Sequence, residues 1–366
     1  MKVITLLTAG HIGGIETLCM DYARLSSHDN VMLILWGDGH VDELMRQQGT
    51  KVINLHASHI NVHATVGRVM QIIRDEQADV LIAQHSAPMS HLCLMRAKKL
   101  FPQIHTIAYA QVDAYDMIAG AGKFRMWLRK TVLRASFKRA DDVVAISQSV
   151  KKSLDTIFGI HDDRIRIIYN AVDLKNFPFS ERRYDSDICE LIYTGRLVPE
   201  KGVQLTLRAL GQVSDNHRFR LRIAGDGDYR EELTRLAEEL GISDIVEFLG
   251  SRDDVPELLK QSDVFIHMPI WAEGFGISVA EAMSTGCICI CASNGAMPEL
   301  ITDGIDGFLV GKEDVSGLAS TLERVYSLSV GEKKRLSQAA RNKAGQFSTD
   351  IFVEKLDELA SRMPDS

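Results

Sequence analysis

The chain has 366 residues, of which 45% are hydrophobic and 25% charged, and its net charge is −7. This composition is typical of globular proteins, and at about 150 residues per domain the length favours two domains. The acidic balance argues against a protein that binds nucleic acid over its whole surface, and no stretch approaches the roughly 18 apolar residues of a spanning helix.

The first residues, "MKVITLLTAGHIGG", lack a cleavage site, because glycines follow an apolar run of only about seven residues. We expect a buried first strand here rather than a signal peptide. The six cysteines lack zinc-site spacing, and "CICIC" at 287–291 favours one face of a buried strand. Reduced cysteines indicate a cytoplasmic protein.

Strand-like and helix-like segments alternate along the first half. Short apolar runs lie at 3–7, 31–36, 52–55, 80–83, 105–108, 143–146 and 165–168, and amphipathic stretches such as 15–25 and 65–75 lie between them. Such alternation predicts a parallel sheet with helices on both faces.

The alternation stops at 178–187, "PFSERRYDSD", which carries five charges and little that could be buried, so we predict a linker there. It resumes at 191–194, 221–224, 246–249, 264–267, 287–291 and 308–310, and the chain is helical from about 316. The predicted fold is α/β, with two Rossmann-like doubly wound parallel-sheet domains, 1–175 and 176–345, facing across a cleft. Ligands of such sheets bind at the carboxyl ends of the strands.

Three loops at predicted strand ends carry candidate binding residues. Gly10, Gly13 and Gly14 follow the first strand, where backbone amides can face an anion, but their spacing is not that of a dinucleotide fingerprint. In "GRLVPEKG", Arg196 and Lys201 suit a diphosphate, although a solvated basic loop is the plainer alternative. In "AGDGDY", flanking glycines favour a turn at Asp226 and Asp228 over a metal site.

The segment "EGFGISVAEAMSTG" places Glu273 and Glu281 on either side of a predicted helix start. Eight residues of helix rise about 12 Å, too far for the two acids to share a proton. The amides of Gly274, Phe275 and Gly276 favour an anion or sugar hydroxyls, whereas a carboxylate in the same place must bind neutral hydroxyls. These residues favour a ligand with hydroxyls at one or both ends and negative charge in the middle, and a nucleotide-sugar has that pattern.

These motifs resemble those of the retaining glycosyltransferases of family four, which have the GT-B architecture. The resemblance rests on "GRLVPEKG", "AGDGDY", "FLGSRDDVPELLKQSDVFI", "EGFGISVAEAMSTG" and "GAMPELITDGIDGFLV", and less tightly on "GGIET", "ADDVVAISQSVKK" and "IYNAVDLKNF". It implies transfer of a sugar, of hexosyl type, from a nucleotide-diphosphate donor to a glycan or lipid-linked acceptor, in the synthesis of cell-surface polysaccharide or glycoconjugate. An epimerase of the same architecture and a non-catalytic nucleotide-sugar-binding protein are the alternatives.

The resemblance also implies a role for each matching residue. Glu273 would contact the donor sugar with the amides of Gly274, Phe275 and Gly276, and Glu281 would hold the ribose. Arg196 and Lys201 would neutralise the leaving diphosphate, and Gly14 would close on the donor phosphate. The C-terminal helix, about 346–366, would pack back on the first domain. No cofactor is expected, because the nucleotide-sugar is a substrate, and the resemblance implies a reaction without a bound metal.

The sequence departs from the family where many members carry a histidine near the donor sugar. Here "TIAYAQVDAYD" offers Gln111 and Asp113, which we expect to contact the donor sugar or the acceptor. Gln111 can form hydrogen bonds but cannot act as an acid or base. His11, His85 or His91 could take the place of the family histidine, whereas we interpret His56, His59 and His63 as loop residues rather than a metal cluster.

A basic stretch at 122–140 carries no acidic residue. Its seven cations are Lys123, Arg125, Arg129, Lys130, Arg134, Lys138 and Arg139, with Phe124, Trp127, Leu128 and Phe137 interleaved. A cationic amphipathic helix can lie on the inner face of an anionic membrane. A helix that packs its apolar side on the sheet explains the pattern equally well, and nucleic acid fits the acidic chain less well.

Overall fold

The computed structural model describes residues 1–8, 13–37, 41–57, 61–84, 87–119 and 122–362, and its chain divides into two compact units. The first consists of Met1–Asn170 with Thr349–Ser366, and the second of Ala171–Ser348. The sequence places the boundaries at 175/176 and 345/346, a few residues from these.

The first unit is built on a seven-stranded sheet of parallel strands in the order β3-β2-β1-β4-β5-β6-β7. Its strands are β1 Lys2–Leu7, β2 Asp29–Ile34, β3 Lys51–Asn54, β4 Val80–Ala83, β5 His105–Ala110, β6 Asp142–Ala145 and β7 Ile165–Ile167. Its helices are α1 Gly14–Leu25, α2 Val41–Gln47, α3 Val62–Asp75, α4 Pro88–Leu100, α5 Ala114–Ile118, α6 Lys123–Arg139, α7 Gln148–Phe158, α15 Thr349–Ala360 and the 3₁₀ turn η1 Asp162–Arg164.

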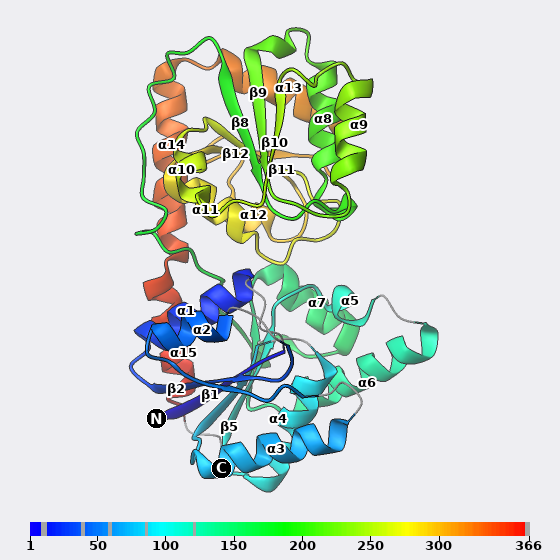
Figure 1. Cartoon of the computed structure of the whole chain (residues 1–366), viewed down its shortest axis with the longest axis vertical. Helices are drawn as coiled ribbons and strands as arrows, with labels where there is room; N and C mark the ends of the chain where they lie inside the picture. The colour runs from blue at the N-terminus through cyan, green and yellow to red at the C-terminus, as the bar shows by residue number, and fades with distance from the viewer. Residues whose placement is uncertain (9–12, 38–40, 58–60, 85–86, 120–121, 363–366) are drawn as a thin grey trace. The chain divides into compact units, whose positions relative to one another are not determined.

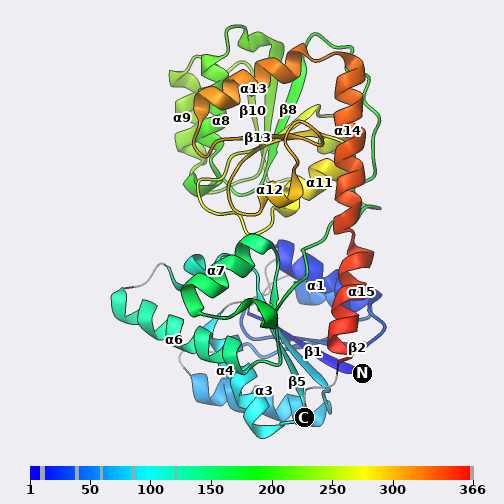
Figure 2. The ribbon, with the colours of Figure 1, turned by 180° about the vertical axis from the view of Figure 1, so that it is seen from behind.

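Helices cover both faces of this sheet, because its central strands are apolar on both sides. One face packs on α3 and α4, and the other on α1 and α2. The last helix, α15, lies beside α1 (Figures 1 and 2), where the rings of Tyr22 and Phe352 meet edge to face at 6.3 Å.

The second unit is built on a six-stranded parallel sheet in the order β10-β9-β8-β11-β12-β13. Its strands are β8 Cys189–Thr194, β9 Phe219–Ala224, β10 Val246–Gly250, β11 Val264–His267, β12 Ile288–Ala292 and β13 Phe308–Val310. Its helices are α8 Val203–Gln212, α9 Arg230–Glu239, α10 Val255–Lys260, α11 Ile277–Thr285, α12 Met297–Leu300, α13 Val315–Ser327 and α14 Val330–Ala344, with 3₁₀ turns η2 Pro199–Lys201, η3 Asn216–Arg218 and η4 Gly345–Phe347. Helices α8, α9 and α13 lie on one face and α10, α11 and α14 on the other (Figure 1).

The prediction of two doubly wound parallel sheets is therefore confirmed. The prediction that 178–187 is a linker with little to bury is wrong. The segment belongs to the second unit, and Arg182 is buried, with its guanidinium donating to the carbonyls of Thr285 and Leu259 at 2.8 and 2.7 Å. The six cysteines are buried and free, and within the described residues no helix is long and apolar enough to cross a bilayer.

Candidate functional site

The candidate site in the second unit is a cavity of about 750 Å³ at the carboxyl ends of β8, β9 and β10. Parallel α/β sheets bind their ligands at this edge, and the volume suits a small molecule of nucleotide size. Its lining comes from residues 176–177, from the ends of the three strands and the loops after them, and from α10 and α11. It consists of Asn176, Phe177, Thr194, Gly195, Arg196, Ala224, Gly225, Asp226, Ser251, Arg252, Asp253, Val255, Pro256, Glu257, Ser278 and Glu281.

Close packing of two strand-end loops forms the floor of this cavity. Gly225 has a φ of +152°, and a Cβ there would lie 1.8 Å from the carbonyl oxygen of Gly195. Only glycine avoids this clash, so the "AGDGDY" motif serves the crossing of the loops. Asp226 accepts a hydrogen bond from the amide of Gly227 at 2.9 Å, which is the turn geometry that the glycines predict.

Two of the predicted binding residues line the cavity directly. Arg196 follows β8 and its side chain is exposed, and Glu281 lies in the second turn of α11. Burial raises the pKa of the Glu281 carboxyl to about 8, so this acid is largely neutral near pH 7.

The other predicted acid is paired with the other predicted cation. The Nζ of Lys201 lies 2.6 Å from Oε2 of Glu273, and Nε2 of His267 lies 3.2 Å from the same oxygen. Burial alone would raise the pKa of Glu273, but the hydrogen bond from His267 and the charge of Lys201 hold it well below its usual range. Glu273 is therefore an anion, in contrast to Glu281.

The backbone that carries Glu273 is held by the loop after β12. Asn294 donates its side-chain amide to the carbonyl of Trp271 at 2.6 Å, and the amide of Ala296 donates to the carbonyl of Glu273 at 2.9 Å. A Cβ on Gly295, whose φ is +59°, would lie 2.3 Å from that carbonyl oxygen. Sequence patterns alone did not predict a role for Asn294, Gly295 or His267, although a histidine ends the apolar run "VFIH".

In the glycine turn before α11, Gly276 and Phe275 have different structural roles. Gly276 has a φ of +94° and caps the helix, while the side chain of Phe275 is buried and packs edge to face on Phe347 at 5.4 Å. The ring thus anchors the turn, which leaves only the backbone of 274–276 to meet a ligand.

The candidate residues of the first unit lie in three different local environments. Gly14 is the first residue of α1, and Asp113 caps α5 by accepting from the amide of Tyr115 at 2.8 Å. Gln111 is buried, accepting from Asn170 at 3.1 Å and donating to Gln84 at 2.8 Å, so both ends of its amide are already engaged.

His91 cannot stand in for the family histidine, and that expectation is wrong. Its side chain is fully buried against Phe137, its Nδ1 lies 2.8 Å from Oγ of Ser136, and burial lowers its pKa to about 3. It is a neutral core residue beneath α6. His11, His85 and His59 lie outside the described residues, and His56 and His63 are exposed.

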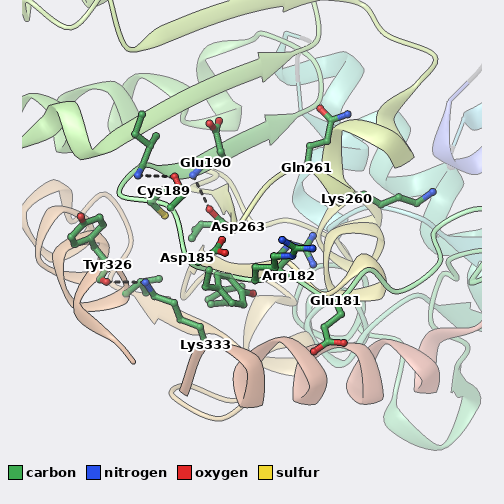
Figure 3. A pocket seen from close by; sticks show the side chains of 17 residues that line it. Glu181, Arg182, Asp185, Cys189, Glu190, Lys260, Gln261, Asp263, Tyr326 and Lys333 are labelled. Carbon is green, nitrogen blue, oxygen red and sulfur yellow. Dashed lines mark hydrogen bonds between the residues drawn. The ribbon is translucent and has the colours of Figure 1, made fainter. Parts of the chain in front are cut away.

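A smaller cavity of about 280 Å³ opens at the amino ends of β8, β11 and β12 (Figure 3). Its charged groups serve the fold. Asp263 accepts from the amide of Glu190 at 3.0 Å, and Lys333 donates to the carbonyl of Tyr326 at 2.8 Å. We therefore regard the cavity at the opposite edge of the sheet as the candidate site.

Comparisons with known proteins indicate the family. Residues 12–176 match the family described as Glycosyltransferase Family 4, and residues 179–343 match Glycosyl transferases group 1. An uncharacterized glycosyltransferase of Methanocaldococcus jannaschii is 30% identical over 198 residues, which are 50% of this chain and 50% of that protein. D-inositol 3-phosphate glycosyltransferase of Mycolicibacterium smegmatis is 29% identical over 283 residues, 74% of this chain and 64% of that protein. The chain thus spans between about half and two thirds of the length of these relatives.

Solved structures show the same fold. Anabaena HepE, crystallised with UDP, superimposes with a TM-score of 0.86 at 22% identity, covering 99% of this chain and 100% of that one. The lipopolysaccharide outer core galactosyltransferase WaaB in its apo form superimposes with a TM-score of 0.78 at 21% identity, covering 98% of this chain and 99% of that one. Because two glycosyltransferase families together match nearly the whole sequence, and the two-sheet fold agrees with the motifs at its strand ends, the chain belongs to glycosyltransferase family 4.

Proposed function

We propose that this protein transfers a sugar from a nucleotide-diphosphate donor to a hydroxyl acceptor with retention at the anomeric carbon. The observation that carries the proposal is the division of charge at one sheet edge. Arg196 lines the cavity beside a largely neutral Glu281, and an ionised Glu273 is paired with Lys201 at the start of α11.

The charges match the parts of such a donor. The ribose hydroxyls would reach Glu281, the diphosphate would reach Arg196 and Lys201, and the sugar hydroxyls would reach Glu273 and the amides of 274–276. The bond from the anomeric carbon to the phosphate oxygen breaks, and its electron pair leaves with the nucleotide diphosphate. The acceptor oxygen bonds to the same face of that carbon, and its proton passes to a leaving phosphate oxygen. Arg196 and Lys201 would stabilise the charge that develops there.

The donor is tested by a thermal-shift screen with the UDP, GDP and ADP forms of glucose. We choose UDP-glucose as the first probe because HepE was crystallised with it. A ligand at a hundred times its dissociation constant stabilises the fold by about 2.7 kcal/mol, which shifts the melting temperature by several degrees. The absence of a shift with every nucleotide-sugar would contradict the proposal.

The two glutamates should differ in kinetics. We expect Glu273→Gln to lower turnover strongly while UDP affinity is kept, and Glu281→Gln to act mainly on donor affinity. An acceptor-free incubation separates the alternatives, since an epimerase would release altered nucleotide-sugar without an acceptor. A non-catalytic binding protein would bind the donor and turn over nothing.

The exposed residues of helix α6 favour the proposal of a lipid-linked acceptor at an anionic membrane surface. Its second half packs through buried Leu133 and Phe137, whereas Phe124, Trp127 and Leu128 in its first half are 73%, 60% and 47% exposed. Figure 1 shows this first half extending away from the sheet of its own unit. Exposed aromatic rings among cations are typical of helices that lie in a membrane interface.

Vesicle sedimentation tests this contact. Each cation near an anionic surface contributes about 1 kcal/mol, so Lys123→Glu, Arg125→Glu and Lys130→Glu together should release the protein from phosphatidylglycerol vesicles. Reversal of the exposed cations Arg208, Lys312 and Lys355, which lie outside α6, is the matched control and should leave binding intact. Wild-type protein that stays in the supernatant at low salt would show that α6 is a solvated face.

A further inference from the structure

His267, the last residue of β11, lies buried directly behind Glu273. Its side chain is 2% exposed, and its ring lies nearly parallel to that of Tyr193, 6.5 Å away at 13°, and to that of Phe265, 6.3 Å away at 22°. These two rings fix the imidazole plane, and its Nε2 lies 3.2 Å from Oε2 of Glu273.

The surroundings select one protonation state for this ring. Burial lowers the pKa of His267, and the hydrogen bond to Glu273 offsets this only in part, so the imidazole is neutral near pH 7. A neutral imidazole has one N–H, and an ionised carboxylate can only accept. The proton therefore lies on Nε2, which agrees with a buried Nδ1 that has no partner among the described residues.

The two contacts of Glu273 fall on the same oxygen. Lys201 and His267 both approach Oε2, and within the described part of the chain Oε1 takes part in no hydrogen bond or ion pair. If Lys201 moves to the diphosphate when the donor binds, the N–H of His267 is the donor that still holds Oε2 and keeps the carboxylate ionised.

We infer that His267 is a positioning residue for the transfer reaction, which leaves Oε1 of Glu273 to accept from a donor-sugar hydroxyl. The inference rests on the proposed function for the role of Glu273, but the hydrogen bond itself is testable without substrate. Nitrogen-15 NMR of the labelled histidines reports the tautomer in the ligand-free protein, with the His267 signals assigned by their loss in variants. We expect the neutral Nε2–H form near pH 7. An Nδ1–H tautomer or an imidazolium would overturn the inference.

Kinetics with the donor found by the thermal-shift screen tests the role. His267→Phe keeps a stacked ring without the N–H, and His267→Gln restores a donor. We expect turnover to fall by about tenfold or more in His267→Phe with UDP affinity unchanged, since a hydrogen bond to a charged group is lost. In His267→Phe the acid limb of the pH–rate profile should move to higher pH, because Glu273 loses the hydrogen bond from His267 that helps to lower its pKa. His267→Gln should recover activity.

Equal losses in the two variants, or an altered KM with unchanged turnover, would overturn the positioning role. If the wild-type protein turns over no nucleotide-sugar, the proposed function is contradicted. The tautomer measurement does not depend on turnover, so it would still test the hydrogen bond from His267 to Glu273.

Discussion

At the scale of single residues, the two cations proposed for the diphosphate differ in the ligand-free protein. Arg196 is exposed at the cavity, whereas Lys201 already neutralises Glu273 at 2.6 Å. Binding of a diphosphate by Lys201 must therefore compete with an existing ion pair, and binding by Arg196 does not.

We accordingly expect Arg196→Ala to weaken UDP binding more than Lys201→Ala does. Loss of a charged hydrogen bond costs about 1.5–3 kcal/mol, or roughly ten- to a hundredfold in affinity. Calorimetry with UDP measures both effects, with Arg208→Ala on α8 as an exposed control. Unchanged affinity in both variants would remove these residues from the site.

The raised pKa of Glu281 predicts a pH dependence of nucleotide binding. Ribose hydroxyls bind a carboxylate better than a neutral acid, because hydrogen bonds to charged groups are stronger. Since the pKa is about 8 in the free protein, binding must remove a proton below that pH, so affinity should rise towards pH 8 and then level off. The ratio of wild-type to Glu281→Gln affinity for UDP isolates this effect from ionisation of the phosphate. A ratio that is constant with pH would contradict it.

At the scale of elements, sequence patterns predicted the regular structure but not the contacts of irregular segments. Apolar runs predicted the strands because buried parallel strands need such runs on both faces. Arg182 was interpreted as part of a linker because charge usually marks solvent, and its distant carbonyl partners lie 77 to 103 residues further along the chain. The pairing of His267 with Glu273 depends on a loop path that Asn294 and Gly295 hold, and local spacing does not encode that path.

Arg182 should be essential to the second unit for this reason. Its guanidinium donates to the carbonyls of Ser262, Thr285 and Leu259, and removing the side chain takes a charged donor from each of these carbonyls. We expect Arg182→Met to lower the free energy of unfolding by about 3 kcal/mol or more in urea titrations. Arg183→Met is the matched control, because the neighbouring side chain is exposed and should tolerate the change. Equal stabilities would mean that water satisfies these carbonyls.

At the scale of the whole molecule, the end of the chain completes the unit in which the chain begins. Asp357 on α15 accepts from Oγ of Ser26 at 2.6 Å and from the amide of Ser27 at 2.8 Å. The first unit therefore depends on a helix that follows the whole second unit in the sequence.

This dependence predicts that Asp357→Ala destabilises the first unit and leaves UDP binding in the second unit unchanged. The loss should be about 1–3 kcal/mol, because hydrogen bonds to a charged group disappear. Burial would raise the pKa of Asp357, but the hydrogen bonds from Ser26 and Ser27 lower it overall. Its stabilisation is therefore present above the usual aspartate pKa and lost as pH falls through the lowered value, so the two proteins should converge in acid. Hydrogen exchange of α1 and β2 measures the effect, with the exposed Asp350→Ala on the same helix as control. Equal protection in the two variants at neutral pH would show that apolar packing alone, such as that of Tyr22 on Phe352, holds α15 in place.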